Sequence, residues 1–359
     1  MCRTVNGFDV NFKDYYERNI KLIIKGEKPS LDLTSAFQKD GRGNICPVTI
    51  ILPTLAMMAR KHIEKQLEKE AAQTGDLPGE PDPEKIYEYF MHLLENKMSD
   101  AKDMLIERFN WICKQPAESG KFMYENKTMA GYIPEEGIVS ALKHGTLTIG
   151  LLGMAETSQI IFGQDHTSGR GMEFADEVIA YWGKKCKEYK EKYKLNFGVY
   201  YTPAESLCYT ALKKFRKTYG VIPNVSDKEY FTNSIHVPVW KEMDPFQKID
   251  IESRWANKGN AGTITYVELP STVKHNLEAL ETLVKYAMDK DIPYFAVNLP
   301  LDCCEDCGYQ DEIGDVCPKC GSPNITRLRR VTGYLSTDYH NFNYGKQCET
   351  EMRVKHVKN

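Results

Sequence analysis

The sequence predicts an α/β fold with parallel strands, followed by a small cysteine-rich segment. Two observations point to this class. Short apolar runs of strand length alternate with longer runs that have the apolar spacing of amphipathic helices. The composition then changes at about Leu301, where a cluster of cysteines begins. Alternating strands and helices are typical of a parallel sheet or barrel that is covered by helices.

The first elements follow from local patterns. Residues 48–52 form a β-branched apolar run, which predicts a buried strand, and residues 55–70 have helical apolar spacing. Residues 73–83 are rich in glycine, proline and acidic side chains, which predicts an exposed loop. Pro83 suits the start of a long helix at 84–113, because the first helical turn needs no N–H from that residue.

The rest of the chain repeats this alternation up to residue 300. Strands are expected at 146–152, 197–201, 264–269 and 294–299, and helices at 173–192, 205–219 and 274–290. The sequence contains no internal repeat and no low-complexity tract. The predicted architecture is therefore a series of strand–helix units in one sheet or barrel.

Composition limits the classes of function. The 359 residues are 42% hydrophobic and 27% charged, as in soluble globular proteins, and the net charge of -3 leaves no broad basic surface for nucleic acid. The longest apolar stretch is interrupted by Pro53 and Thr54 and is too short to cross a bilayer. Eleven cysteines without an export signal predict a reducing, cytoplasmic environment, where cysteines act as metal ligands or reactive thiols.

The cysteine cluster has the spacing of a zinc site. Cys304 and Cys307 form one C-x2-C pair, and Cys317 and Cys320 form another. Two such pairs supply four thiolates to one tetrahedral ion, with no open position for a substrate, so we expect a structural zinc in a short ribbon. The glycines after each pair, at positions 308 and 321, predict turns with positive φ. The alternatives are four unrelated reduced cysteines, or Cys303 in place of Cys304.

A second motif follows the cluster directly. Gly333 lies in the segment Arg-Val-Thr-Gly-Tyr-Leu, residues 330–335, between a threonine and two bulky side chains. A glycine there weakens a strand and usually marks a bulge or tight turn. It is also the residue whose Cα radical can become planar without a Cβ clash. Both interpretations are open for the hexapeptide alone, and the adjacent cysteine cluster favours the radical.

Residues 330–335, the cysteine cluster before them and the segment at 342–346 together resemble the radical loop of the anaerobic (class III) ribonucleoside-triphosphate reductases. The resemblance covers nearly the whole chain but only the C-terminal part of a family member. It implies a partial ten-stranded α/β barrel at 1–300, a zinc ribbon at 301–325, and a glycyl-radical loop and tail at 326–359. The chain is then a fragment, a mis-started reading frame or one piece of a split enzyme, and we expect it to be catalytically incomplete by itself.

The resemblance also implies catalytic residues. Gly333 would carry the glycyl radical, and Cys2 would become the thiyl radical, although Met1 stands where the family has a glycine before this cysteine. Thr4 matches a hydroxyl residue near the substrate 2'-position. Asn44, in Gly-Arg-Gly-Asn, matches an active-site asparagine, with a glycine-rich turn as the alternative. Cys46 is expected in the core, on the same side as Asn44 if the strand has begun there.

Residues 202–206 could contact the substrate phosphates. Thr202 suits a helix N-cap, Pro203 a first helical residue and Glu205 the third residue of a capping box, which explains this segment without any ligand. A strand-to-helix turn also collects phosphate, and the matching family segment lines the triphosphate site, so we expect Thr202, Pro203, Ala204, Glu205 and Ser206 to bind substrate. Cys208 is expected to be packed, and a substrate-side role for His236 stays open.

The function implied by the resemblance is radical reduction of ribonucleoside triphosphates to 2'-deoxyribonucleoside triphosphates. The resemblance also implies ATP binding, a role in DNA replication and a homodimer. The implied partners are an activating enzyme with S-adenosylmethionine and an iron–sulfur cluster, and formate or a thiol protein as reductant. One alternative is another glycyl-radical enzyme, of the pyruvate formate-lyase or diol-dehydratase kind, but those lack the cysteine cluster beside the glycine. The other is a non-enzymatic zinc-ribbon scaffold.

Overall fold

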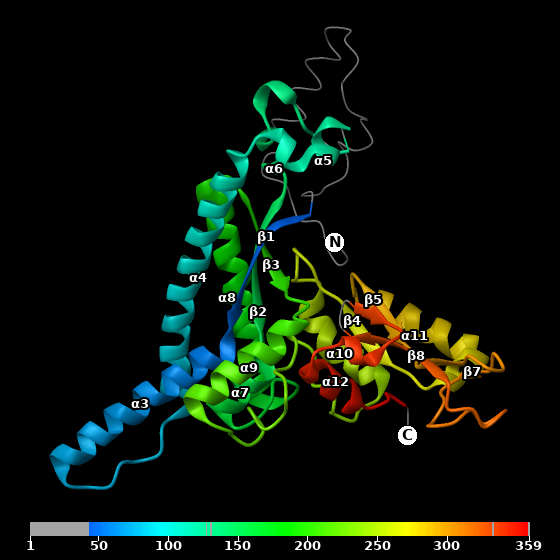
Figure 1. Cartoon of the computed structure of the whole chain (residues 1–359). Helices are drawn as coiled ribbons and strands as arrows, with labels where there is room; N and C mark the ends of the chain where they lie inside the picture. The colour runs from blue at the N-terminus through cyan, green and yellow to red at the C-terminus, as the bar shows by residue number, and fades with distance from the viewer. Residues whose placement is uncertain (1–42, 127, 130, 332–333, 358–359) are drawn as a thin grey trace.

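The structure, a computed structural model, describes residues 43–126, 128–129, 131–331 and 334–357 (Figure 1). The predicted mixed α/β class is confirmed. Within these ranges the strands form a three-stranded sheet in the order β1-β2-β3, a two-stranded sheet β4-β5 and a four-stranded sheet β7-β6-β8-β9. The first two sheets are parallel and the last is antiparallel.

The strands are β1 (Asn44–Ile51), β2 (Thr146–Leu152), β3 (Asn196–Tyr201), β4 (Thr265–Glu268), β5 (Phe295–Asn298), β6 (Leu301–Cys304), β7 (Gln310–Asp311), β8 (Ile325–Val331) and β9 (Tyr334–Ser336). The α-helices are α3 (Leu52–Thr74), α4 (Pro83–Cys113), α5 (Lys121–Glu125), α6 (Val139–Leu142), α7 (Met154–Phe162), α8 (Gly169–Tyr193), α9 (Ser206–Tyr219), α10 (Pro245–Ala256), α11 (Leu277–Asp289) and α12 (Tyr344–Glu351). Short 3-10 helices lie at Ala117–Gly120, Pro134–Glu136, Ser271–His275 and Tyr339–Asn341.

The first sheet has one apolar and one polar face. Successive residues of β2 alternate between leucine or isoleucine and threonine or glycine up to residue 151, so the two kinds point to opposite faces. The apolar face packs against α4 and α8, which run beside the strands (Figure 1). The indole N–H of Trp182 on α8 donates to the carbonyl of Ile149 at 3.0 Å and fixes this packing. Core formation thus leaves the opposite, polar face available for a site.

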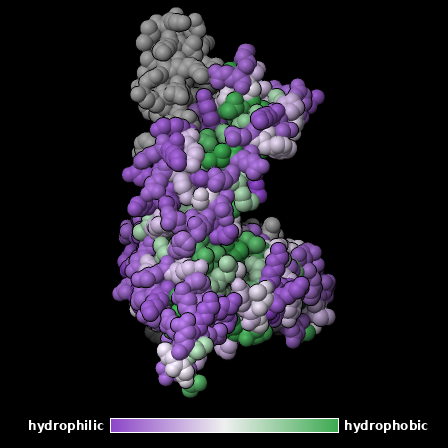
Figure 2. All heavy atoms as spheres, turned by 90° about the vertical axis from the view of Figure 1, so that its left-hand side faces the viewer, coloured by the Kyte–Doolittle hydropathy of each residue, from purple (hydrophilic) through white to green (hydrophobic). Residues whose placement is uncertain are grey.

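The outer helices are amphipathic. Phe90, Leu94, Met98 and Leu105 of α4 are fully buried against the sheet, at the spacing of one helix face. Figure 2 shows the side of the molecule on which α3 and α4 lie. The surface on this side is mostly hydrophilic, with smaller hydrophobic areas. None of the described helices is long and apolar enough to cross a membrane.

A second, smaller core supports β4 and β5. It is formed by Ile249 and Ala256 of α10, Val267 of β4 and Leu283 and Ala287 of α11. The four-stranded sheet follows and joins the cysteine-rich segment to the C-terminal hairpin, because β8 pairs with β6 on one side and with β9 on the other. The order along the chain is therefore core sheet, small sheet, ribbon and tail.

Several predicted boundaries need correction. The first strand begins at Asn44 rather than at residue 48, and α3 begins at Leu52 because Pro53 occupies its first turn. Helices α5, α6, α7, α10 and α12 were not predicted. Helix α10 was missed although Asp244 and Gln247 form a capping box at its start and Pro245 occupies its first turn. The described strands do not by themselves close a ten-stranded barrel, so the barrel and the division at residues 300 and 325 stay predictions.

The polar face of the sheet depends on a close contact at Gly198. A Cβ there would lie 2.7 Å from Cβ of Ala261, so Gly198→Ala must push the segment around Ala261 off the sheet. We expect the free energy of unfolding to fall by about 1–3 kcal/mol, measured by urea denaturation.

Gly183→Ala is the matched control. Nothing lies within 4 Å of a Cβ at this position in α8, and alanine favours the helix by up to about 1 kcal/mol. Equal stability of the two variants would contradict the close contact at Gly198.

Candidate functional site

Three of the predicted catalytic residues, Cys2, Thr4 and Gly333, lie outside the described residues, so their roles stay predictions. The strands on both sides of Gly333 are described. Val331 of β8 pairs with Tyr334 of β9 in an antiparallel register. The described candidate site consists of Asn44, residues 202–206 and the four cysteines.

Asn44 lies at the start of β1, buried on the polar face of the sheet. Its amide nitrogen donates to the carbonyl of Ala261 at 2.8 Å, across a sequence separation of 217 residues. This bond is possible because Gly198 leaves room for Ala261 over the sheet. The amide is therefore held in one orientation, with its nitrogen on the protein and its oxygen available.

Three buried oxygens on or beside this face lack a partner. Among the described residues, no hydrogen-bond partner reaches Asn44 Oδ1, Thr148 Oγ1 or Thr263 Oγ1. Buried polar atoms without a partner are rare, and each usually marks a missing ligand, water or chain segment. Two hydroxyls and one amide oxygen are groups that can bond to the hydroxyls of a polar ligand.

Cys46 does not lie on the side predicted for it. A β-bulge between Asn44 and Cys46 shifts the register, so Asn44 pairs with Thr146 while Cys46 pairs with Leu147. The extra residue turns Cys46 to the apolar face, next to Cys113 of α4. Burial raises the pKa of the Cys46 thiol, and the expectation that it belongs to the core is confirmed.

Residues 202–206 connect β3 to α9 at the carboxyl edge of the parallel sheet. The Thr202 hydroxyl lies 2.8 Å from the Thr49 hydroxyl of β1, and it occupies the space above Gly150, where a Cβ would lie 2.0 Å from it. The N–H of Ala204 donates to Asn233 Oδ1 at 2.8 Å. The segment is thus held by two neighbours, β1 and the loop that contains Asn233.

The predicted helix cap at this position is wrong. Helix α9 begins at Ser206, and Glu205 occupies the N-cap position without a side-chain cap bond. Thr202 lies three residues before the N-cap position, and its hydroxyl bonds to Thr49 instead of the helix. The first turn of α9 therefore has no side-chain cap, which leaves its positive end suited to an anion.

Cys208, in the first turn of α9, is packed as predicted. Its thiol donates to the carbonyl of Ala204 at 2.9 Å, and burial raises the pKa of the thiol to about 12. A neutral, hydrogen-bonded thiol of this kind is a poor nucleophile. Its role in this structure is to fix residue 204 against the helix.

A buried carboxyl anchors the loop at 230–237. Glu156 of α7 accepts hydrogen bonds from both the N–H and the hydroxyl of Thr232 at 2.7 Å each, and its second oxygen has no described partner. Burial raises the pKa of this carboxyl to about 6, although the bonds from Thr232 act to lower it. Asn233 and Ser234 follow directly and contact the residues around Thr202.

His236 ends this loop in a buried charged cluster. Its Nδ1 lies 3.3 Å from Glu252, which also accepts from the N–H of Val237 at 3.1 Å and from Lys248 at 2.8 Å. Burial acts to raise the pKa of Glu252, but the charges of Lys248 and His236 outweigh it and hold the pKa well below its usual range. His236 is therefore a buried imidazole held by Glu252, and a substrate-side role for it stays a prediction.

The four cysteines of the ribbon lie together. Their sulfurs are all within 4.8 Å of one another, with Cys304 and Cys320 3.5 Å apart and Cys307 and Cys317 3.6 Å apart. Four sulfurs about 2.3 Å from a central zinc ion stand nearly 4 Å apart, so the arrangement fits that ion. Gly308 and Gly321 have φ of 70° and 75°, which confirms the positive values that their positions predict.

A buried carboxylate joins the ribbon to β8. Asp302 of β6 is fully buried and bonds to Arg327 and Arg329, which stand two residues apart on β8, and to the N–H of Ile313. Two residues of spacing place both arginines on one face of the strand. The ribbon thus fixes the strand that leads to Gly333 by charge as well as by backbone pairing.

Some site residues were not found from the sequence. The alternation of threonine and glycine with leucine and isoleucine at 146–151 could have revealed the polar face, because a fully buried strand has no reason to alternate. Nothing local marks Glu156, Asn233 or Glu252, whose partners lie in other parts of the chain.

Comparison with known proteins gives one consistent result. A family model described as "Anaerobic ribonucleoside-triphosphate reductase" matches residues 2–356. Proteins of that name from Escherichia coli and Haemophilus influenzae are 31% and 30% identical, each over 89% of this chain and 43% of the relative. The protein from Enterobacteria phage T4 is 30% identical over 88% of this chain and 49% of its own length.

Solved structures agree in fold. An anaerobic ribonucleotide reductase superposes with a TM-score of 0.59 at 22% identity, over 88% of this chain and 45% of that chain. The Thermotoga maritima enzyme in complex with dATP and CTP gives a TM-score of 0.51 at 22% identity, over 82% and 43%. The chain spans less than half the length of each of these proteins.

Removal of one thiol should release the metal. We expect about one zinc ion per chain by elemental analysis under reducing conditions, and a large loss of bound zinc in Cys317→Ser, because three thiolates no longer close the coordination shell. Cys303→Ser is the control, since Cys303 lies outside the group of four sulfurs. Wild-type protein without zinc, or equal loss in both variants, would contradict the site.

Glu156 should make stability depend on pH. Its pKa is raised from 4.5 to about 6, so the stability that the neutral carboxyl contributes is full below about pH 4.5 and is lost as pH rises through about 6. The side chain introduced by Glu156→Gln cannot ionise. Relative to wild type, the free energy of unfolding of this variant should therefore rise by about 2 kcal/mol between about pH 4 and pH 7, measured by urea denaturation. Parallel pH profiles of the two proteins would show that Glu156 does not titrate in this range.

Proposed function

The chain belongs to the anaerobic ribonucleoside-triphosphate reductase family, and we propose that it forms the radical-bearing catalytic part of such an enzyme. One structural observation supports this assignment above the others. Cys304 ends β6, which pairs with β8 in the sheet that also includes β9, so the cysteine cluster is attached to the two strands on both sides of Gly333. Because the chain spans less than half of its relatives, nucleotide reduction is proposed for these residues in a full-length enzyme.

The proposed chemistry is a chain of hydrogen-atom transfers. An activating enzyme with S-adenosylmethionine and an iron–sulfur cluster removes one hydrogen atom from Gly333. The glycyl radical takes a hydrogen atom from the Cys2 thiol, and the thiyl radical takes the 3'-hydrogen of the ribose. Water leaves from the 2'-carbon after protonation of its hydroxyl. Two electrons from formate, which leaves as carbon dioxide, or from a thiol protein, which forms a disulfide, complete the reduction.

The polar sheet face is the proposed ribose site. The unpartnered oxygens of Asn44, Thr148 and Thr263 can each accept a hydrogen bond from a ribose hydroxyl, and Thr4 would act near the 2'-position. Asn44 is suited to this because Ala261 already holds its amide nitrogen, so the oxygen needs no reorientation when substrate binds. Because the Asn44 oxygen is already fixed, it can hold the ribose in one position. This favours radical transfer, which needs a short and constant distance between the ribose and the radical.

The proposed triphosphate site is the start of α9. The first turn has no side-chain cap, and its N–H groups and helix dipole favour anions. Thr202 contributes a hydroxyl beside this end, and Pro203 and Ala204, whose N–H already donates to Asn233, shape the turn that leads to Glu205 and Ser206 at the start of the helix. In this arrangement the phosphates lie at the carboxyl edge of the parallel sheet, where ligands of such sheets commonly bind.

The remaining parts of the proposal concern the whole enzyme. A closed ten-stranded barrel would exclude water and oxygen from the radicals, and it would include strands outside this chain. The zinc ion, held by Cys304, Cys307, Cys317 and Cys320, would keep the ribbon folded and take no part in the reaction. A homodimer in the cytoplasm is the proposed assembly.

Oxygen should cut the activated chain at one place. A glycyl radical reacts with oxygen and breaks the backbone at that residue, so we expect a doublet in electron paramagnetic resonance before exposure and a peptide from the C-terminal end, starting near residue 334, after it. Mass spectrometry identifies the cut. Gly333→Ala should lack both the doublet and the peptide.

The control is the zinc content of Gly333→Ala. It should equal that of wild type, because position 333 lies outside the ribbon. A doublet that persists in Gly333→Ala, or cleavage at another residue, would refute the assignment of the radical.

A further inference from the structure

We propose that Arg353 is a positioning residue for the radical: it holds strand β8 at Arg330 and thereby fixes the hairpin of β8 and β9 that carries Gly333. The inference rests on the proposed function, because it assigns a role relative to the glycyl radical. It concerns a side chain in the tail, after the radical segment, that neither the motif nor the cysteine spacing indicates.

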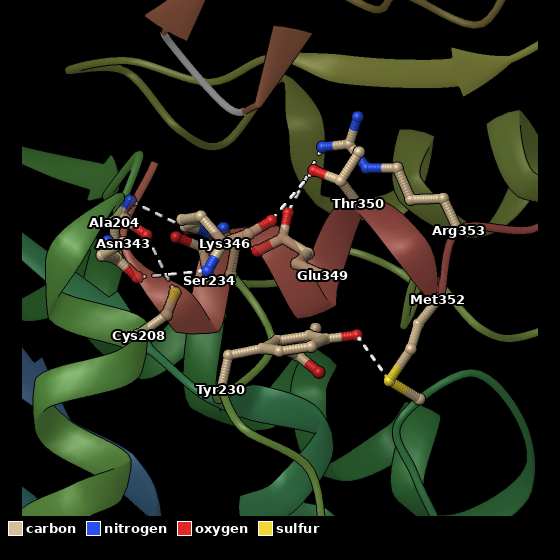
Figure 3. Close-up of polar contacts among 12 residues, drawn as sticks. Ala204, Cys208, Tyr230, Ser234, Asn343, Lys346, Glu349, Thr350, Met352 and Arg353 are labelled. Carbon is tan, nitrogen blue, oxygen red and sulfur yellow. Dashed lines mark hydrogen bonds and ion pairs between the residues drawn. The ribbon is translucent and has the colours of Figure 1, made fainter. Parts of the chain in front are cut away.

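Arg353 makes contacts in three directions. Its Nη1 donates to the carbonyl of Arg330 at 2.7 Å, and the same atom lies 3.3 Å from Glu268 at the end of β4. Its Nη2 lies 3.4 Å from Glu349, one turn earlier in the tail. The side chain is only 12% exposed. Figure 3 shows the Arg353 side chain running back beside the end of α12, with its guanidinium near Glu349 and Thr350.

The backbone on both sides of Arg353 is itself held. The N–H of Val354 donates to the carbonyl of Val239 at 3.0 Å. His356 pairs with Glu268 twice: its N–H donates to the carbonyl at 2.7 Å, and its Nδ1 accepts from the N–H at 2.9 Å. Arg353 is therefore anchored to residues before the ribbon, and it reaches from that fixed place to β8.

Helix α12, which precedes Arg353 in the chain, packs closely against α9. A Cβ on Gly345 would lie 2.7 Å from Cβ of Tyr209 and 2.8 Å from the carbonyl of Glu229, so the helix approaches α9 as closely as a glycine allows. Lys346 forms a buried ion pair with Glu349, and the Tyr230 hydroxyl lies 3.6 Å from the sulfur of Met352 (Figure 3). These contacts fix Glu349, which in turn orients Arg353.

The charges explain why an arginine stands here. Glu268 and Glu349 are largely buried, and Lys346 already pairs with Glu349. The guanidinium of Arg353 adds the second positive charge between the two carboxylates while it donates to a carbonyl, because its nitrogens point in several directions in one plane. A lysine has a single charged atom and a shorter reach. It could keep the pair with Glu349 but would lose the bond to Arg330.

Arg330 is the natural place to hold the hairpin. It lies directly before Val331, which pairs with Tyr334, so a displacement at Arg330 is passed along the strand to the segment between them. The guanidinium of Arg330 lies over the ring of Tyr266 in β4, 5.3 Å from its centre. Side chain and carbonyl of Arg330 are thus both attached to elements outside the ribbon.

Hydrogen exchange of the full chain tests the anchor without any activity. We expect peptides that cover β8 and β9 to exchange about tenfold faster in Arg353→Lys and Arg353→Gln than in wild type, because a charged hydrogen bond to the strand is lost. Lys355→Gln is the matched control: it lies two residues later and breaks an exposed pair with Glu312. Unchanged exchange in both Arg353 variants, or equal acceleration in Lys355→Gln, would overturn the inference.

Arg353→Lys separates positioning from stability. It should keep the zinc content and most of the thermal stability of wild type, because Glu349 retains a cation, and still show fast exchange in the hairpin. If the arginine only neutralised buried charge, lysine would restore slow exchange as well. Full restoration by lysine would therefore refute a positioning role.

Electron paramagnetic resonance then tests the link to the radical. After anaerobic activation, we expect the doublet per zinc-loaded chain to fall about tenfold in both Arg353 variants and to stay unchanged in Lys355→Gln. A wild-type doublet that both Arg353 variants match would refute the inference and leave the proposed function intact. No doublet in wild type would refute the proposed function, and with it this role of Arg353, whatever the exchange data show.

Discussion

Close contact across the polar face of the first sheet is the constraint on which the rest of the structure depends. Helices α4 and α8 cover the other face, so the turn at Thr202 and the segment at Ala261 pack on this one. Gly150 and Gly198 leave the space that Thr202 and Ala261 occupy, and a larger side chain at either position would displace the strand-to-helix turn or the segment that holds Asn44. The site therefore depends first on these two glycines, which leave space over the sheet, and then on the polar groups that occupy this space.

Buried carboxyl groups organise the segments around this face. Glu156 holds the loop at 230–237, Glu252 holds its last residues, Asp302 holds β8 and Glu349 holds the tail. Each of these carboxyl groups joins parts of the chain whose relative position would not be fixed by hydrophobic packing alone. Burying such groups is costly unless they are bonded, so the same interactions that give the segments one position also penalise any other.

The sequence carries the parts of this structure that depend on local patterns. The limits of the strand at 146–152 agree with the prediction, and the paired cysteine spacing correctly predicts a group of four sulfurs and two glycine turns. The errors have non-local causes. The bulge before Cys46 depends on register with β2, and Thr202 fails as a cap because Thr49 takes its hydroxyl. Glu156 meets Thr232 across 76 residues, and no short pattern indicates such a pair.

The contacts that attach the tail determine what would happen to the molecule if oxygen broke its backbone at Gly333. The anchors of residues 344–356 to Tyr209, Glu229, Val239 and Glu268 all lie in the chain before Gly333, and none depends on an intact backbone between the two parts. A single break at that glycine would leave the severed tail bound in its place by noncovalent contacts. An oxygen-damaged molecule would then keep the size and surface of an intact one under native conditions, and its shortened chain would become visible only after denaturation. Cells would meet it as a folded protein, without the exposed apolar surface that marks misfolded chains for removal.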